Sequence, residues 1–221
     1  MNTNRKGYFI LFEGIDGMGK STQAKKLYDA LISMGYKAVM MREPTDGAFG
    51  KAIRERLKSG FKNDMDETLL FTMDRFYDVA FRIHNWLSQE DRVIVMDRYY
   101  YSSIAYQGAK GVDADYLREI NRMFAPEPDV VFLLDAPPHV GLDRKDNNKM
   151  EKDTFENEEY LTRVRKLFLA EAATNKNFVV VDASRSEESV HAEIIGHMLQ
   201  RARGDKPGGD RPRPLVREEL E

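Results

Sequence analysis

Residues 13–22 read EGIDGMGKST, the stretch that decides the fold. Two glycines in it are separated by four residues, and a lysine and a serine follow the second glycine directly. The apolar run Tyr8–Glu13 before this stretch is typical of a buried strand, and the apolar spacing after it is typical of a helix. A glycine loop between a strand and a helix directs backbone N–H groups at phosphate oxygens, and the helix N-terminus favours negative charge there. The stretch therefore predicts a phosphate-binding loop.

This loop has the P-loop pattern, in which particular side chains have chemical tasks. We expect Lys20 to reach the β- and γ-phosphates of a nucleoside triphosphate and the Ser21 hydroxyl to ligate Mg²⁺. The residues expected to bind ATP in this loop are Gly14, Ile15, Asp16, Gly17, Met18, Gly19, Lys20, Ser21 and Thr22.

Short apolar runs alternate with segments of helical period along the chain. The runs predict strands over Tyr8–Glu13, Lys37–Met41, Arg92–Met96, Val130–Leu134 and Phe178–Val181. Buried strands joined by helical crossovers favour an α/β fold of three layers, with a five-stranded parallel sheet between helices. We expect one domain over residues 1–203, with the polar segment 143–154 as a small mobile lid. Residues 204–221 are rich in Gly, Pro and charge, which predicts a disordered tail.

The composition limits the function classes. The 221 residues carry a formal charge of −3, which gives no overall attraction to nucleic acid. The chain has no cysteine, which excludes disulfides, thiolate nucleophiles and cysteine-based zinc sites. No apolar run is long enough to cross a membrane, and the N-terminus lacks a cleavable signal pattern, so we expect a soluble cytoplasmic protein.

P-loop proteins include switches, motors and kinases. A guanine-nucleotide switch would carry the motif Asn-Lys-x-Asp near a late strand. The chain has only NKNF at residues 175–178, which lacks the carboxylate that reads guanine. This difference disfavours a switch.

Charged residues follow several of the predicted strands. Asp97 comes directly after one strand and is placed to hold Mg²⁺, directly or through water; Asp135 competes for this role or is a structural turn residue. Arg98 could pair with a phosphate near the metal, the alternative being a surface ion pair. Arg42 adds an arginine at the same edge of the sheet, where parallel sheets bind ligands. A triphosphate loop beside a cluster of arginines implies phosphoryl transfer between two phosphorylated ligands.

The segment 65–89 has the period of an amphipathic helix. One face carries Leu69, Met73, Phe76, Ala80 and Leu87, which we expect to pack into the protein. The opposite face carries Phe71, Arg75, Asp78 and Arg82. An aromatic ring among charges, four residues before an arginine, could stack on a flat ligand that the arginine also contacts. The alternative for Phe71 is a dimer contact or a small satellite cluster.

Four stretches resemble, in order, the signature segments of thymidylate kinase, a family of P-loop nucleoside monophosphate kinases. These stretches are FEGIDGMGKSTQ, REPT, LLFTMDR and DRYYYSSIAYQGA, and the resemblance extends from about residue 8 to about residue 203. It implies the P-loop kinase fold, a homodimer, and the reaction ATP + dTMP ⇌ ADP + dTDP with Mg²⁺.

The resemblance also implies roles for individual residues. It assigns dTMP binding to Asp16, Arg42, Phe71, Arg75, Arg98, Ser103, Tyr106 and Gln107. Phe71 would stack on thymine, and Arg75 would donate to a thymine carbonyl. Tyr106 would crowd the 2′ position and disfavour ribonucleotides, while Ser103 and Gln107 would line the base pocket.

The same resemblance assigns the phosphate, sugar and adenine contacts. Arg42 and Arg98 would hold the dTMP phosphate, and Asp16 would approach the 3′-hydroxyl of the sugar. Arg144 would stack near adenine, and the loop 183–186, with Ser184 and Arg185, would flank it.

The lid departs from the family pattern. Relatives with glycine at the position of Gly17 bring a catalytic arginine from the lid, but no arginine stands between Arg144 and Arg163 here. We expect Lys149 or Lys152 to take this role, although a lysine is a point charge and cannot clamp phosphate as arginine does. The expected catalytic residues are therefore Lys20, Arg98, Lys149 and Lys152.

Two other functions remain open from the sequence. The chain could be a kinase for another pyrimidine monophosphate such as dUMP, because stacking on Phe71 does not read the thymine methyl group. It could also be a nucleotide-binding regulator that has lost catalysis, for which the arginine-poor lid is the hint. In each case the partner is a small molecule, and neither nucleic acid nor a membrane is expected.

Overall fold

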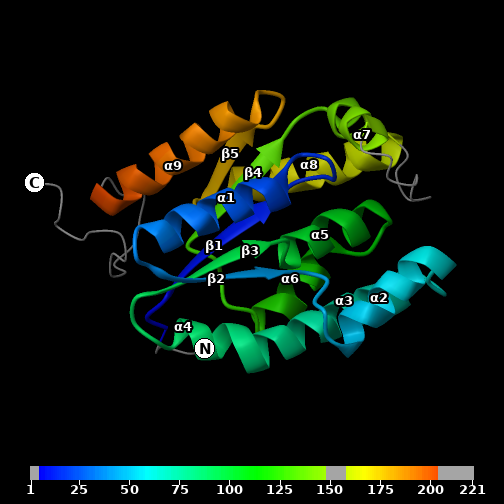
Figure 1. Ribbon diagram of the computed structural model, residues 1–221. Helices are drawn as coiled ribbons and strands as arrows, with labels where there is room; N and C mark the ends of the chain where they lie inside the picture. Colours follow the sequence, from blue (N-terminus) through cyan, green and yellow to red (C-terminus); the bar gives the residue numbers. More distant parts are fainter. Residues whose placement is uncertain (1–4, 148–157, 204–221) are drawn as a thin grey trace, which may run out of the picture.

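The computed structural model describes residues 5–147 and 158–203 and contains one parallel β-sheet (Figure 1). Its strands are β1 Tyr8–Glu13, β2 Lys37–Arg42, β3 Arg92–Asp97, β4 Val130–Asp135 and β5 Phe178–Asp182, in the spatial order β2-β3-β1-β4-β5. The predicted strands are confirmed, and the last four each end one residue later than expected. The added residues are Arg42, Asp97, Asp135 and Asp182. The strands extend to these charged residues because backbone pairing continues one position past each apolar run.

Helices cover both faces of this sheet. They are α1 Lys20–Ser33, α2 Ala48–Ser59, α3 Asp64–Asp78, α4 His84–Leu87, α5 Tyr100–Ala109, α6 Ala114–Arg122, α7 Pro138–Asn147, α8 Glu158–Thr174 and α9 Glu187–Arg203, with a π-helical segment η1 Val79–Ile83 between α3 and α4. α1 packs against β1–β3 and α9, whereas α5 packs between α8 and α3 in the other layer. The predicted three-layer α/β fold is confirmed.

The sheet is buried on both faces, which explains its apolar strands. Residues 9–12 of β1 and 93–96 of β3 are almost completely inaccessible to solvent. A parallel sheet covered by helices on both sides needs continuous apolar strands rather than alternating ones. No helix in the described ranges is both long and apolar enough to span a bilayer.

The strand order creates the place where a ligand can bind. β1 pairs with β3 on one side and with β4 on the other, so the crossovers leave β1 in opposite directions. Ligands of open α/β sheets bind beyond the carboxyl ends of the strands at such a switch point. The loop that follows β1 is the P-loop, and Arg42 and Asp97 end neighbouring strands at the same edge.

Two P-loop glycines are required by close approaches. Gly14 has φ 138°, and a Cβ atom there would lie 2.3 Å from the carbonyl oxygen of Leu134. Gly17 has φ 80°, and its Cβ would lie 2.3 Å from the carbonyl oxygen of Gly141 in α7. Both positions exclude any side chain, because the atoms they would meet belong to the backbone.

The expected inward face of the 65–89 segment is wrong. Leu69, Met73 and Phe76 are 48%, 41% and 46% exposed, and Ala80 is exposed as well; only Leu87 is buried as expected. The buried side of α3 carries instead Glu67, Thr68, Thr72, Asp74, Arg75 and Asp78. Periodicity assumes that apolar side chains face inward. Here Glu67, Asp74 and Arg75 find partners on other segments. The hydroxyls of Thr68 and Thr72 donate to carbonyl oxygens of α3 itself, and Asp78 pairs with Arg82 on the following helical segment.

Asp74 is an example of this compensation. Its carboxylate accepts hydrogen bonds from the backbone N–H and the hydroxyl of Thr45, at 2.7 and 2.6 Å. A buried polar group with good partners costs far less free energy than an unpaired one. α3 is therefore held by polar contacts on its inward side.

The predicted lid and tail lie mostly outside the described residues. α7 extends through Asn147, so the first part of the segment 143–154 is helical. Lys149, Lys152 and the tail 204–221 belong to the part of the chain that the structure does not describe.

Candidate active site

The P-loop lines a cavity of about 740 Å³ together with the loop after β5. Lys20 is 6% exposed; its Nζ donates to the carbonyl oxygen of Ile15 at 2.8 Å and lies 3.7 Å from a carboxylate oxygen of Asp16. Met18, Gly19 and Thr22 also line this cavity. A nearly buried ammonium above a ring of backbone N–H groups is suited to holding phosphate oxygens.

The residues expected to hold Mg²⁺ lie together at this cavity. The Ser21 hydroxyl donates to one carboxylate oxygen of Asp97. The other oxygen of Asp97 is buried and has no hydrogen-bond partner among the described residues. A serine hydroxyl next to a carboxylate with one open acceptor fits Mg²⁺, which keeps most of its waters and takes few protein ligands.

Asp135 does not compete for this role. Its two oxygens accept hydrogen bonds from Nε and Nη2 of Arg165 at 2.7 and 2.8 Å. It is not among the residues that line the P-loop cavity. It therefore forms an ion pair between β4 and α8 and is the last residue of a strand, not the turn residue that was named as the alternative from the sequence.

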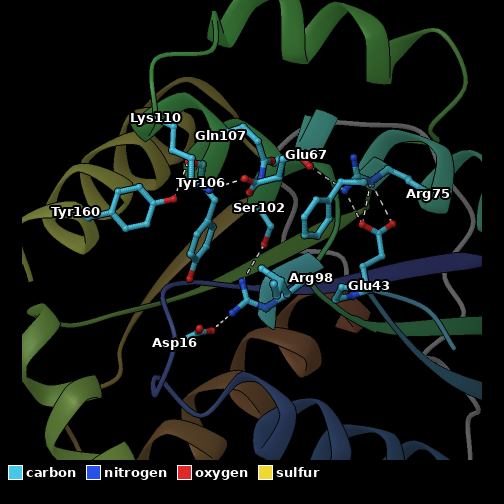
Figure 2. Close-up of a pocket in the computed structure, with 14 residues that line it drawn as sticks. Asp16, Glu43, Glu67, Arg75, Arg98, Ser102, Tyr106, Gln107, Lys110 and Tyr160 are labelled. Atoms are coloured by element: carbon cyan, nitrogen blue, oxygen red, sulfur yellow. Dashed lines mark hydrogen bonds and ion pairs between the residues drawn. The ribbon is translucent and has the colours of Figure 1, made fainter. Parts of the chain in front are cut away.

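A second cavity of about 270 Å³ lies beside the first and is shown in Figure 2. Asp16 and Arg98 line both cavities. The second is otherwise lined by Glu43, Pro44, Leu57, Glu67, Phe71, Arg75, Ser102, Ser103, Tyr106, Gln107, Lys110 and Tyr160. The structure thus brings most of the residues expected to bind dTMP around one hollow.

Arg98 occupies the boundary between the two cavities. It directly follows β3 with φ 69°, in the left-handed region, and its guanidinium forms an ion pair with Asp16. Its Nη1 donates to the Ser102 hydroxyl at 3.3 Å, and its guanidinium lies 5.2 Å from the ring centroid of Tyr106. A cation in this position can contact a phosphate in either cavity.

Glu13 holds the turn that carries Arg98, and sequence reasoning missed it. It is completely buried, and its carboxylate accepts from the backbone N–H of Tyr99 and Ser102, at 2.9 and 3.1 Å, and from the Ser102 hydroxyl at 2.7 Å. Burial raises the pKa of Glu13, and the bond from Ser102 opposes this. An acidic residue that ends an apolar strand was the available signal.

Arg75 is held in the wall of the second cavity by a network that joins four elements. It is 1% exposed; Nε and Nη2 donate to the Glu43 carboxylate, and Nη1 donates to Asn121 at 2.9 Å. Nη2 also donates to the Ser103 hydroxyl at 3.1 Å. Burial raises the pKa of Glu43, whereas the charge of Arg75 lowers it. Glu43 and Asn121 were not expected from the sequence.

The remaining expected residues lie apart from the second cavity. Arg42 forms an ion pair with Asp46 and lines neither cavity; its side chain is 62% exposed. Arg144 donates to the carbonyl oxygen of Ala183 at 2.9 Å, so it joins α7 to the loop after β5. Arg185 lines the P-loop cavity, whereas Ser184 does not and bonds to Asp182. The assigned roles of these residues remain predictions.

Comparison with known proteins identifies the family. Residues 12–194 match the family model described as thymidylate kinase. The chain belongs to the thymidylate kinase family. A probable thymidylate kinase of Archaeoglobus fulgidus is 43% identical over 188 residues, which cover 84% of this chain and 91% of the relative. The thymidylate kinase of Brachyspira hyodysenteriae is 38% identical over 195 residues, covering 86% of this chain and 92% of the relative.

A third relative extends the match over more of the chain. The thymidylate kinase of Xanthomonas oryzae pv. oryzae is 38% identical over 208 residues, which cover 92% of this chain and 90% of the relative. The resemblance stated from the four signature segments is thereby confirmed, and the fold of thymidylate kinases agrees with the sheet described above.

Proposed function

We propose that this chain carries out the thymidylate kinase reaction in the two cavities that meet at Asp16 and Arg98. The reaction transfers the γ-phosphoryl group of ATP to dTMP and gives ADP and dTDP for dTTP synthesis. The observation that carries the assignment is the shared boundary: one arginine lines both the P-loop cavity and the cavity of Phe71. Two nucleotides bound there would direct their phosphates at the same cation.

ATP would bind in the P-loop cavity. Backbone N–H groups of residues 14–22 would surround its phosphates, and Lys20 would bring its charge to the β- and γ-phosphates. Ser21 and Asp97 would hold Mg²⁺, which neutralises charge on the transferring phosphoryl group when bound. Arg144 and Arg185 would contact the nucleoside part, since both line this cavity.

dTMP would bind in the second cavity. Phe71 would stack on thymine, and Arg75 would donate to a carbonyl of the base through Nη1, which also donates to Asn121. Tyr106 would crowd the 2′ position of the sugar and Asp16 would approach the 3′-hydroxyl. Arg98, with Arg42, would hold the phosphate.

This arrangement needs no general base. The attacking oxygen of dTMP belongs to a phosphate that is already an anion at neutral pH. The residues therefore only have to align the two phosphates and stabilise the charge that develops on the transferring group. Lys20 and Arg98 are the described residues suited to this task.

Substrate choice tests the assignment against its alternatives. An assay of ADP release should give the highest kcat/KM with dTMP, a lower value with dUMP and the lowest values with UMP and dCMP. A higher kcat/KM for UMP than for dTMP would contradict the role of Tyr106. ATP turnover that does not depend on any monophosphate would instead favour a nucleotide-binding regulator.

The lid lysines complete the proposal, although they lie outside the described residues. Lys149 or Lys152 would supply the cation that relatives take from a lid arginine. Replacing the active one by Ala should lower kcat by roughly 10²–10³-fold, as for loss of a single transition-state donor. If neither Lys149→Ala nor Lys152→Ala lowers kcat, this part of the proposal fails.

We also infer a homodimer, formed through the outward side of α3 and η1. The exposed apolar residues there, called the α3 stripe, are Met65, Leu69, Met73, Phe76, Tyr77 and Phe81. Phe81 is 67% exposed, although the ring of Tyr77 contacts it. Contiguous exposed apolar surface marks interaction sites, and a second copy of the same helix would cover it symmetrically.

Sedimentation analysis tests the dimer. Met73→Glu together with Phe76→Glu should convert the dimer to a monomer, because two charges per chain would be buried in the interface. Met123→Glu is the matched control, since Met123 is 84% exposed and lies outside the α3 stripe. An unchanged dimer in the double variant would place the interface elsewhere.

A further inference from the structure

The side-chain amide of Gln107, in the wall of the second cavity, has a hydrogen-bond partner for its nitrogen but none for its oxygen among the described residues. Gln107 lies on α5 and is 2% exposed. Its Nε2 donates to Oε1 of Glu67 at 2.8 Å, and its Oε1 is buried with no hydrogen-bond partner among the described residues. A buried acceptor without a partner costs free energy unless a ligand supplies a donor.

Glu67 is itself held from the other side. It lies on α3, is 4% exposed and accepts a hydrogen bond from Nζ of Lys110 through its second carboxylate oxygen. Figure 2 shows Glu67, Gln107 and Lys110 grouped at one end of the cavity that all three line. The adjacent cation compensates the buried negative charge, which would otherwise oppose an anionic ligand.

The hydrogen bond between Gln107 and Glu67 fixes the orientation of the Gln107 amide. An amide has a donor end and an acceptor end of nearly equal shape, so its orientation is set by its partners. An ionised carboxylate only accepts hydrogen bonds. Glu67 therefore requires the NH₂ group of Gln107 on its side and leaves the carbonyl oxygen of Gln107 for a ligand.

We propose that Glu67 is a positioning residue that sets base choice by fixing Gln107 as a hydrogen-bond acceptor. The inference rests on the proposed function, because it needs the base of dTMP in this cavity. Thymine and uracil carry an N–H donor at N3 beside a carbonyl oxygen, whereas cytosine has an acceptor at N3 and an amino group in place of that carbonyl. A fixed acceptor next to the donor Arg75 matches the first pattern and opposes the second.

The decisive comparison is between two substitutions of Glu67. Glu67→Gln keeps the size of the side chain but gives it a donor, so the Gln107 amide can reverse. Glu67→Asp is shorter and packs less well, but it remains an acceptor only. A purely structural role predicts that the shorter side chain does more harm, whereas the proposed role predicts the opposite order for base discrimination.

The measured quantity is the ratio of kcat/KM for dTMP to kcat/KM for dCMP, at saturating ATP in the full-length enzyme. Glu67→Gln should lower this ratio about tenfold, in line with the loss of one buried hydrogen bond. Glu67→Asp should stay within about twofold of the wild-type ratio on the same reasoning. A wild-type ratio in Glu67→Gln, or a larger loss in Glu67→Asp, overturns the proposal.

A double variant tests whether Glu67 acts through Gln107. Gln107→Met removes the acceptor, so it should lower the ratio by itself, and adding Glu67→Gln should lower it no further. Additive losses would mean that Glu67 acts independently of Gln107. Glu171→Gln is the matched control, since Glu171 is 2% exposed, pairs with Arg118 and lines neither cavity.

Failure of the proposed function would look different. Phe71→Ala should raise KM for dTMP if the base stacks in this cavity. An unchanged KM would mean that the base binds elsewhere, whatever the Glu67 variants do. A raised KM with an unchanged ratio in Glu67→Gln would keep the cavity and reject only the positioning role of Glu67.

Discussion

The P-loop and the wall of the second cavity each form one of the two proposed nucleotide sites, but the P-loop uses mainly backbone groups and the cavity wall uses side chains. The P-loop is one continuous stretch, residues 13–22. Its glycines allow the backbone N–H groups to approach the phosphates that we propose bind there. The cavity wall is held by side chains from one loop and three helices: Glu43 in the loop after β2, Arg75 on α3, Ser103 on α5 and, behind the lining residues, Asn121 on α6. One region is local in the chain and the other exists only after folding.

The two regions should also respond differently to substitution. A P-loop side chain such as Lys20 acts on a ligand, so its loss should lower the rate and leave the fold intact. A cavity-wall side chain such as Arg75 neutralises another buried group, so its loss should lower stability as well. A residue expected to bind the substrate, such as Arg75, can therefore also stabilise the fold around the site.

The largest effect is expected for Arg75→Ala. The change leaves the Glu43 carboxylate buried without its cation, which should lower the free energy of unfolding by about 3–5 kcal/mol. Denaturant unfolding of the ligand-free protein measures this loss. The double variant Arg75→Met with Glu43→Gln should recover much of it, because no unpaired charge remains; a loss below about 1 kcal/mol in Arg75→Ala, the usual size at exposed sites, would contradict the comparison.

Lys20→Ala should show the opposite profile. Loss of this cation from the P-loop should lower kcat by roughly 10²–10³-fold, as for removal of one charge-stabilising donor. The free energy of unfolding should change by less than about 1 kcal/mol. Lys20 lies 3.7 Å from a carboxylate oxygen of Asp16 and acts on the buried Glu13 only through its charge, whereas Glu43 is hydrogen-bonded directly to Arg75. Steady-state kinetics and denaturant unfolding of the same preparation check both parts. A large loss of stability with a small effect on kcat in Lys20→Ala would contradict the expected difference between the P-loop and the cavity wall.

Glu13→Gln probes a residue of the P-loop stretch that is hydrogen-bonded to Ser102 in the wall of the second cavity. The amide keeps the size of Glu13 but places a donor near the Ser102 hydroxyl, which then holds Arg98 less well. We expect kcat/KM for dTMP to fall about tenfold, which corresponds to one misplaced charge-assisted hydrogen bond. Ser102→Ala should give a similar loss through the same contact. Wild-type kinetics in both variants would show that Arg98 does not depend on this turn.

A pH-dependent effect on stability is expected at the inward side of α3. Burial raises the pKa of Asp78 to about 6, with Arg82 opposing the shift. Because the folded-state pKa lies above the unfolded value near 4, the contribution of Asp78 to stability is complete below about pH 4 and is lost as pH rises through 6. Asp78→Asn should therefore gain about 2–3 kcal/mol over wild type between pH 4 and pH 7, because a shift of about two pKa units corresponds to a free energy of this size. Unfolding curves at several pH values test this, and parallel curves for the two proteins would exclude it.

The helix α3 shows where prediction from the sequence failed. The period of 65–89 was recognised correctly, but the apolar side was expected inside and lies outside. A helix with one apolar side buries that side somewhere, and the period alone does not say whether the partner is its own sheet or a second chain. The inward polar side finds partners in Thr45 and Glu43 from the β2–α2 connection and in Gln107 from α5.

The sheet and the P-loop could be predicted from the sequence. Tyr8–Glu13 and the stretch 13–22 encode a strand, a glycine loop and a helix within one short segment, and backbone conformation depends mainly on such local patterns. Asp97 and Arg98 could be placed at the same edge because parallel strands bring their carboxyl ends together.

The partners of Glu13, Glu43, Glu67 and Gln107 could be identified only in the folded protein. Each is nearly or completely buried, and each is bonded to a side chain or backbone group at least 32 residues away in the chain. A buried charge is tolerable only where a partner meets it in space, and that meeting depends on how separate elements pack. For this reason the phosphate loop could be read from the sequence, whereas the orientation of groups in the base cavity could not.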